Sequence, residues 1–109
     1  MRQWDIYAYP FSEGEHPAVI LSPDEWCLNP DVPDVNVLFC ATHRPITRAP
    51  KAFEIVLDQS DGLDWKTTVR CHKLILVRKD ALKRRWGSVS PARRREIGRK
   101  LVEVFRLPL

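Results

Sequence analysis

The sequence predicts a mainly β domain that ends in one α-helix, folded as a small, strongly bent barrel or sandwich of roughly five to seven short strands. Two patterns carry this prediction. Before Ser90, runs of aromatic and branched residues alternate with stretches rich in Pro, Asp and Gly, as strands alternate with turns. After Ser90 the apolar spacing becomes three and four, the period of a helix face. The length of 109 residues suits one core, so we expect a single domain over residues 1–109.

The first part of the chain predicts three strands. Residues 3–9 are rich in aromatic and branched side chains and predict the first strand, and residues 10–17 predict a loop. Residues 18–21 form a second apolar run of strand length. Residues 23–34 hold three prolines and four acids and predict a long exposed connection. Residues 35–41 then predict a buried strand.

The middle of the chain continues the β pattern. Residues 43–51 contain two prolines and predict a polar loop. Residues 53–57 predict a strand with one more solvent-exposed face. Residues 58–64 are rich in residue types that favour turns. Residues 65–77 are one long β-favouring stretch, which we expect to be kinked or divided near His72-Lys73.

The C-terminal part predicts a helix. One helical turn over residues 80–85 and a short strand over residues 86–89 precede it. Ser90-Pro91 is a helix start, with a hydroxyl N-cap and proline at the first position. Pro108 prevents further extension. The apolar stripe expected to face the core consists of Ile97, Leu101, Val104 and Phe105.

Charge is divided unevenly along the chain. Residues 1–77 hold seven Lys and Arg against eleven Asp and Glu, a net charge of −4, whereas residues 78–109 hold eleven against three, a net charge of +8. A basic end on an acidic body indicates a polyanion or an acidic protein as partner. A solvated basic helix without a partner remains the alternative.

Composition excludes several classes of protein. A content of 44% hydrophobic and 29% charged residues is not that of a disordered or fibrous chain. No apolar run approaches the ~20 residues of a membrane span, and the N-terminus lacks a signal peptide's apolar stretch, so we expect a cytosolic protein. The three cysteines, Cys27, Cys40 and Cys71, are odd in number and widely spaced, which predicts reduced thiols.

Several segments, taken in order, resemble the PemK/MazF-like toxins of bacterial toxin–antitoxin modules. The most specific are the Pro-x-Val-x-x-Ser-Pro-Asp-Glu pattern that starts at Pro17 and the ungapped stretch over residues 69–90. The other matching segments are residues 5–7, His16 and Thr42. The resemblance implies an SH3-like barrel with a C-terminal helix, of the CcdB/PemK kind, as a homodimer. It also implies cleavage of single-stranded RNA without a metal or other cofactor, and neutralisation by an acidic antitoxin.

The sequence departs from the family pattern at the expected catalytic positions. His16-Pro17 stands where the family usually has Arg-Pro, and that arginine is catalytic in the family. Thr42 is kept, but the Arg-Cys-Asp element is here Arg70-Cys71-His72, and Ile75 replaces a further arginine. The pattern therefore indicates that this chain retains the barrel of the family but has a different set of active-site residues.

Metal-independent RNA cleavage needs a base for the 2′-OH, an acid for the 5′-oxygen and a cation for the phosphorane. Histidine suits both proton transfers because its pKa lies near 6.5. We therefore expect His16 and His72 to transfer protons, Arg70 to stabilise the transition state and Thr42 to position the substrate. The expected RNA contacts are His43, Arg44 and Lys73, and the expected antitoxin contacts are Arg93, Arg94 and Arg99, with Arg95 beside them.

Each of these residues also has a purely structural interpretation. His16 and His43 could be surface-loop histidines, and His72 a polar strand residue. Arg70 could pair with Asp58 or Asp64. A zinc site built from Cys40, His43, Cys71 and His72 is disfavoured, since Cys71 and His72 point to opposite faces of a strand. Cys40 and Cys71 are better interpreted as buried apolar residues.

Aromatic residues offer base-stacking candidates near the N-terminus. Strand alternation assigns one face of the first strand to the core, so only some of them can be available for stacking. Trp65 and Trp86 are instead predicted to make core or dimer contacts. The candidates for stacking are Trp4, Tyr7, Tyr9, Phe11 and Trp26.

Two hypotheses of function follow. The first is a toxin-like endoribonuclease, favoured by Thr42, Arg70 and the added histidines. The second is a degenerate barrel without nuclease activity, acting as a binding module or as a growth inhibitor of a protein such as gyrase, as CcdB-like relatives do. The loss of arginine at position 16 favours the second.

Overall fold

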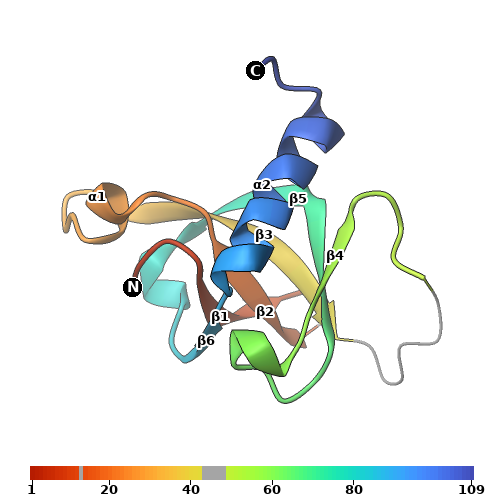
Figure 1. Cartoon of the computed structure of the whole chain (residues 1–109). Coiled ribbons are helices and arrows are strands. Elements are labelled where there is room, and N and C mark those ends of the chain that lie inside the picture. The colour runs from red at the N-terminus through yellow and green to blue at the C-terminus, as the bar shows by residue number, and fades with distance from the viewer. Residues whose placement is uncertain (13, 43–48) are drawn as a thin grey trace.

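The computed structural model describes residues 1–12, 14–42 and 49–109. It shows one antiparallel six-stranded sheet, in the order β4-β5-β3-β2-β1-β6, that curls into a half-barrel with one long helix packed against it (Figure 1). The predicted fold class, mainly β with a C-terminal helix, is confirmed. In chain order the elements are β1 (Asp5–Phe11), β2 (Gly14–Ile20), α1 (Asp24–Cys27), β3 (Asp34–Thr42), β4 (Glu54–Leu57), η1 (Gln59–Asp61), β5 (Thr67–Arg78), η2 (Lys79–Ala81), β6 (Arg85–Ser88) and α2 (Pro91–Phe105).

The loop predicted over residues 10–17 is wrong, because β1 and β2 extend through most of it. Their ladder continues to the pairs Pro10 with Glu15 and Phe11 with Gly14. The amide of Ala8 bonds to the carbonyl of Arg84, the residue before β6, so the Pro10 nitrogen, two residues further along β1, faces an open edge. Proline is tolerated there because no partner strand requires its missing N–H. The longer hairpin places His16 within a strand.

Apolar side chains cover both faces of the sheet. The face under α2 carries Leu38 and Cys40 of β3, and alternation puts Val35 and Val37 on the other face. Cys40 and Cys71 lie fully buried on the helix side, as predicted, and all three cysteines are free thiols. The helix-side core consists of Ile6, Val19, Leu38, Cys40, Leu57, Leu63, Val69, Cys71, Val89 and Ile97.

The apolar stripe of α2 agrees with the prediction at three positions of four. Ile97 is fully buried, and Leu101 and Val104 pack against the core. Phe105 is 45% exposed, so its predicted place in the core is wrong. It is the last residue of the helix, where α2 extends past the sheet (Figure 1), and it lies about 100° around the helix from Val104.

β5 bends sharply in its middle, as the sequence predicted near His72-Lys73. In the ladder with β3, Leu38 faces Leu74 but Cys40 faces Val69. One residue of β3 therefore lies opposite four residues of β5, which is an extended bulge. The bend changes the direction of residues 70–73, so that the cationic groups of Arg70 and Lys73 lie over the ring of Phe39 in β3.

Candidate functional site

A cleft of about 810 Å³ opens where the β1–β2 hairpin, the end of β3 and the turn after η1 meet. A volume of this size is typical of ligand sites in proteins. His16 and Thr42, two residues that the sequence predicts to act in catalysis, both line it. The full lining is Glu15, His16, Pro17, Thr42, Gly62, Leu63, Asp64, Trp65, Thr67, Arg84 and Trp86.

His16 is half-buried in β2 and packs among aromatic rings. Its imidazole centroid lies 5.4 Å from the Phe39 ring and 6.3 Å from the Phe11 ring. Thr42 ends β3 and is partly exposed, and alternation places it on the face of Cys40, opposite the face of Phe39. The two residues therefore reach the cleft from different faces of the sheet.

Two cations share the Phe39 ring with His16. The Arg70 guanidinium carbon lies 5.4 Å from the ring centroid, and Lys73 Nζ lies 4.8 Å from it. Arg70 Nε is shielded from solvent and has no hydrogen-bond acceptor among the residues that the structure describes. We call Phe11, His16, Phe39, Arg70 and Lys73 the Phe39 cluster. It concentrates positive charge beside a histidine at the edge of the cleft, which is suited to a phosphate.

His72 does not join the Phe39 cluster. It is exposed on β5, and its ring packs on Phe53, with the centroids 3.9 Å apart. The pKa of His72 lies below the ordinary 6.5. The largest cause is partial burial, followed by the positive charges of Lys73 and Arg70, whereas the negative charge of Glu54 raises the pKa. Its neutral form is therefore favoured near neutral pH.

We expect the His72 ring protons to titrate below pH 6.5 in a proton NMR experiment, and Lys73→Ala to raise that pKa. The substitution removes a positive charge that disfavours the imidazolium. Lys66→Ala serves as the control, since Lys66 is an exposed lysine beside the same strand that does not contribute to the shift. A His72 pKa that is equal in both variants would contradict the assignment of the shift to Lys73.

Two predicted RNA contacts, His43 and Arg44, lie outside the described residues. The third, Lys73, is exposed and belongs to the Phe39 cluster. Of the four predicted catalytic residues, His16 and Thr42 both line the cleft. His16 and Arg70 both contact the Phe39 ring. His72 contacts Phe53 instead.

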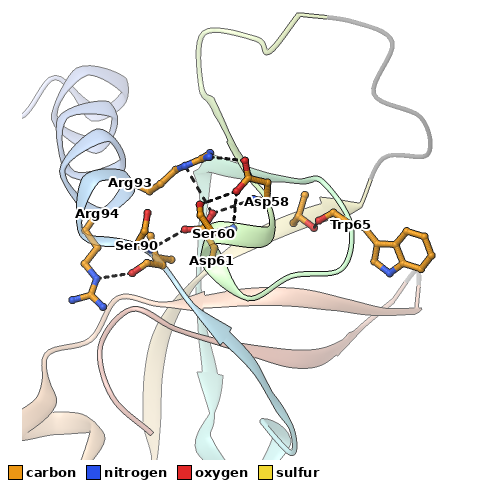
Figure 2. Close-up of polar contacts among 9 residues, drawn as sticks. Asp58, Ser60, Asp61, Trp65, Ser90, Arg93 and Arg94 are labelled. Atoms are coloured by element: carbon orange, nitrogen blue, oxygen red, sulfur yellow. Dashed lines mark hydrogen bonds and ion pairs between the residues drawn. The ribbon is translucent and has the colours of Figure 1, made fainter.

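Two arginines of the basic face of α2 are engaged within the chain (Figure 2). Arg93 Nη2 donates to Asp58 Oδ2 at 2.9 Å, and its Nε lies 3.8 Å from an oxygen of the buried Asp61. Arg94 donates through Nε to the Val89 carbonyl at 2.7 Å. An acidic partner would have to compete with these contacts at Arg93 and Arg94. Arg99, the third predicted antitoxin contact, is exposed, as is the neighbouring Arg95.

Asp61 explains why the helix starts where it does. Ser90 is the N-cap and Pro91 follows it, as predicted, but the Ser90 hydroxyl makes no capping bond. Instead the Ser90 amide donates to Asp61 Oδ1 at 2.8 Å, so a carboxylate on η1 satisfies the N-cap amide (Figure 2). The structural alternative considered for Arg70, a pair with Asp58, is not observed; Asp58 bonds to Ser60 and Arg93.

Sequence reasoning missed several residues of the cleft. Trp65 is 51% exposed and lines it, so of its two predicted places, the core or a dimer contact, the core is excluded. Trp86 packs against the core, as predicted, but also lines the cleft. Arg84 and Glu15 form an ion pair of 2.7 Å although they are 69 positions apart. No local pattern signals such a pair.

The cysteine thiols are protonated groups of the core. Burial, followed by the neighbouring Cys71, raises the pKa of Cys40, and burial raises the pKa of Cys71 to about 11. Within residues 1–12, 14–42 and 49–109, no three His, Cys, Asp or Glu side chains gather as a metal site would require. Over the same residues, no helix has the length and apolar character of a membrane span.

Solved structures of similar fold cover almost the whole chain. An endoribonuclease in complex with its cognate antitoxin from Mycobacterial species has a TM-score of 0.83 at 23% identity, covering 100% of this chain and 98% of that one. The Mycobacterium tuberculosis toxin MazF-mt6 has a TM-score of 0.79 at 20% identity, covering 96% and 99%. The MazE-MazF structure from Deinococcus radiodurans has a TM-score of 0.77 at 15% identity, covering 99% and 97%.

At the level of sequence, no curated protein matches the chain significantly. Residues 2–105 do match the family of PemK-like, MazF-like toxins of type II toxin-antitoxin systems. This match spans nearly all of the chain, and the six-stranded half-barrel with its terminal helix is the fold of that family. The chain therefore belongs to the PemK-like, MazF-like toxins of type II toxin-antitoxin systems.

Proposed function

We propose that this toxin is a metal-independent endoribonuclease that cleaves single-stranded RNA. The observation that carries the proposal is the position of His16, which lies on the 810 Å³ cleft with Thr42 and on the Phe39 ring with Arg70 and Lys73. His16 thus lies with the Thr42 hydroxyl on the cleft and with two cations on the Phe39 ring. Membership of the toxin family and the endoribonuclease among its structural neighbours support the same reaction.

The reaction needs two proton transfers and one charge-stabilising group. The RNA 2′-oxygen attacks the adjacent phosphorus and loses its proton to a base, while the P–O5′ bond breaks and the 5′-oxygen takes a proton from an acid, leaving a 2′,3′-cyclic phosphate. His16, which lies on the cleft, fits one of these two proton transfers, whereas His72 packs on Phe53 and does not line the cleft. Arg70 stabilises the charge on the phosphorane, and Thr42 positions the phosphate through a hydrogen bond.

We further propose that an acidic antitoxin neutralises the toxin and, as the family resemblance implies, that the toxin works as a homodimer. The net charge of +8 over residues 78–109 favours an acidic partner, and two of the structural neighbours are described as complexes with an antitoxin or as MazE-MazF. Arg99 and Arg95 offer exposed guanidinium groups on α2 for such a partner, whereas Arg93 and Arg94 are already engaged.

Incubation of the purified protein with a long single-stranded RNA in EDTA tests the nuclease directly. We expect discrete fragments that end in a cyclic phosphate, because the proposed chemistry uses side chains alone. Intact RNA would favour the second hypothesis, a barrel that inhibits growth by binding a protein. Fragments that form with Mg²⁺ but not with EDTA would contradict the metal-independent mechanism.

A further inference from the structure

Phe39 lies at the point where β5 leaves its ladder with β3. The ladder stops at Leu38 and resumes at Cys40, so Phe39 is the residue of β3 that faces the bulge over residues 70–73. The Phe39 side chain is only 5% exposed. A nearly buried phenyl ring is therefore placed against the segment of β5 that carries two cationic side chains.

Neighbouring aromatic rings fix the position of the Phe39 ring. The strand registers pair Tyr9 with His16 and Ala18 with Phe39, so these side chains share one face of the sheet. The Phe11 ring meets the Phe39 ring edge to face, with centroids 4.5 Å apart, and the Tyr9 ring meets the Phe11 ring in the same way at 4.6 Å. The Phe39 ring is thus held in place, with the His16 imidazole 5.4 Å from it.

The Arg70 guanidinium lies over this fixed ring. Its central carbon is 5.4 Å from the ring centroid, within the range of a cation–π contact. Arg70 Nε is shielded from solvent and finds no hydrogen-bond acceptor within residues 1–12, 14–42 and 49–109. A carboxylate partner would offset the positive charge and occupy N–H groups, whereas an aromatic face attracts the cation and leaves its N–H donors available.

We propose that Phe39 is a positioning residue of the nuclease, whose ring holds the Arg70 guanidinium beside His16 and leaves its charge available to the phosphorane. The inference rests on the proposed function, in which Arg70 stabilises that phosphorane. Phe39 is nearly buried and does not line the cleft, so it acts through Arg70 and not by contact with RNA. The Lys73 ammonium, 4.8 Å from the same centroid, belongs to an exposed side chain.

Nuclear magnetic resonance of the protein without RNA tests whether the ring holds Arg70. The measured quantity is the order parameter of the Arg70 Nε–H bond. We expect an ordered bond in the wild type and in Phe39→Tyr, and a mobile bond with an order parameter below about 0.6 in Phe39→Leu. Leucine keeps an apolar side chain but offers no aromatic face to the cation. Equal order parameters in the wild type and Phe39→Leu would overturn the proposal.

Phe53→Leu is the matched control, because Phe53 is another ring that packs on a histidine of this sheet. Its centroid lies 3.9 Å from that of His72, which is not part of the Phe39 cluster. We expect Phe53→Leu to leave the order parameter of Arg70 unchanged. Loss of Arg70 order in both variants would indicate a general loosening of β5 and would contradict a specific role for Phe39.

Cleavage kinetics test whether this positioning serves the reaction. Phe39→Leu should lower kcat on the order of 10- to 100-fold with little change in KM, because a misplaced guanidinium weakens an interaction made in the transition state. Phe39→Tyr should keep most of the wild-type kcat. In an Arg70→Ala background Phe39→Leu should cost far less, since residues that act as a unit are not additive. Equal fold-losses in the two backgrounds would show that Phe39 does not act through Arg70.

The two measurements also separate this proposal from the nuclease itself. If the wild type cuts no RNA, the proposed function is wrong, and the order parameter of Arg70 alone decides whether the ring holds the guanidinium. If RNA is cut and folded Phe39→Leu keeps the wild-type kcat, the nuclease stands and the positioning role of Phe39 is wrong.

Discussion

His16→Ala should reduce RNA cleavage by about 10²- to 10⁴-fold, the contribution that one positioned proton-transfer group typically makes. His16 is the one predicted catalytic residue that lies both on the cleft and on the Phe39 ring beside Arg70. The substitution removes ring contacts worth about 0.5–1.5 kcal/mol, so the protein stays folded. The measurement is the initial rate of cleavage in EDTA, with folding checked by circular dichroism.

His16→Arg is the informative companion variant, since it restores the guanidinium that is usual in the family. Arginine places a fixed cation at the cleft but cannot exchange protons near neutral pH. We therefore expect a rate between those of the wild type and His16→Ala. A wild-type rate in folded His16→Ala would show that the imidazole takes no part in the chemistry.

Gly87→Ala should cost about 3 kcal/mol of stability or more, a large effect for one methyl group. A Cβ at position 87 would lie 2.2 Å from the Asp61 carbonyl oxygen and 3.2 Å from the Gly62 Cα. Both obstacles are backbone atoms, so β6 or η1 would have to move. Asp61 would move with η1, and its carboxylate holds the Ser90 amide at the start of α2.

Thermal unfolding followed by circular dichroism checks this prediction. A loss of about 3 kcal/mol lowers the Tm of a domain of this size by on the order of 12 °C or more. Gly98→Ala is the control, because a Cβ there meets nothing within 4 Å and alanine favours the helix by up to about 1 kcal/mol. A Gly87→Ala protein as stable as the wild type would show that β6 and η1 can separate freely.

Much of the fold could be predicted because local patterns specify it. The apolar run of β3, the Ser90-Pro91 start of α2 and the bend of β5 near His72-Lys73 all occur where the sequence indicates them. The errors have tertiary causes. Residues 10–17 contain two prolines that favour a loop, but the open edge of the sheet beside Pro10 allows the hairpin to continue.

The candidate site divides in the same way. The sequence determined by itself which side chains could transfer protons or bind phosphate, and His16, Thr42 and Arg70 were predicted from their chemistry and from the family pattern. Only the tertiary structure decided which of these side chains lie close together. The cleft brings β2 beside the turn after η1, and Arg84 pairs with Glu15 across it. The Phe39 ring contacts His16 and two cations from the bend of β5. Contacts between residues so far apart in the chain depend on the curl of the whole sheet, and no local pattern encodes that curl.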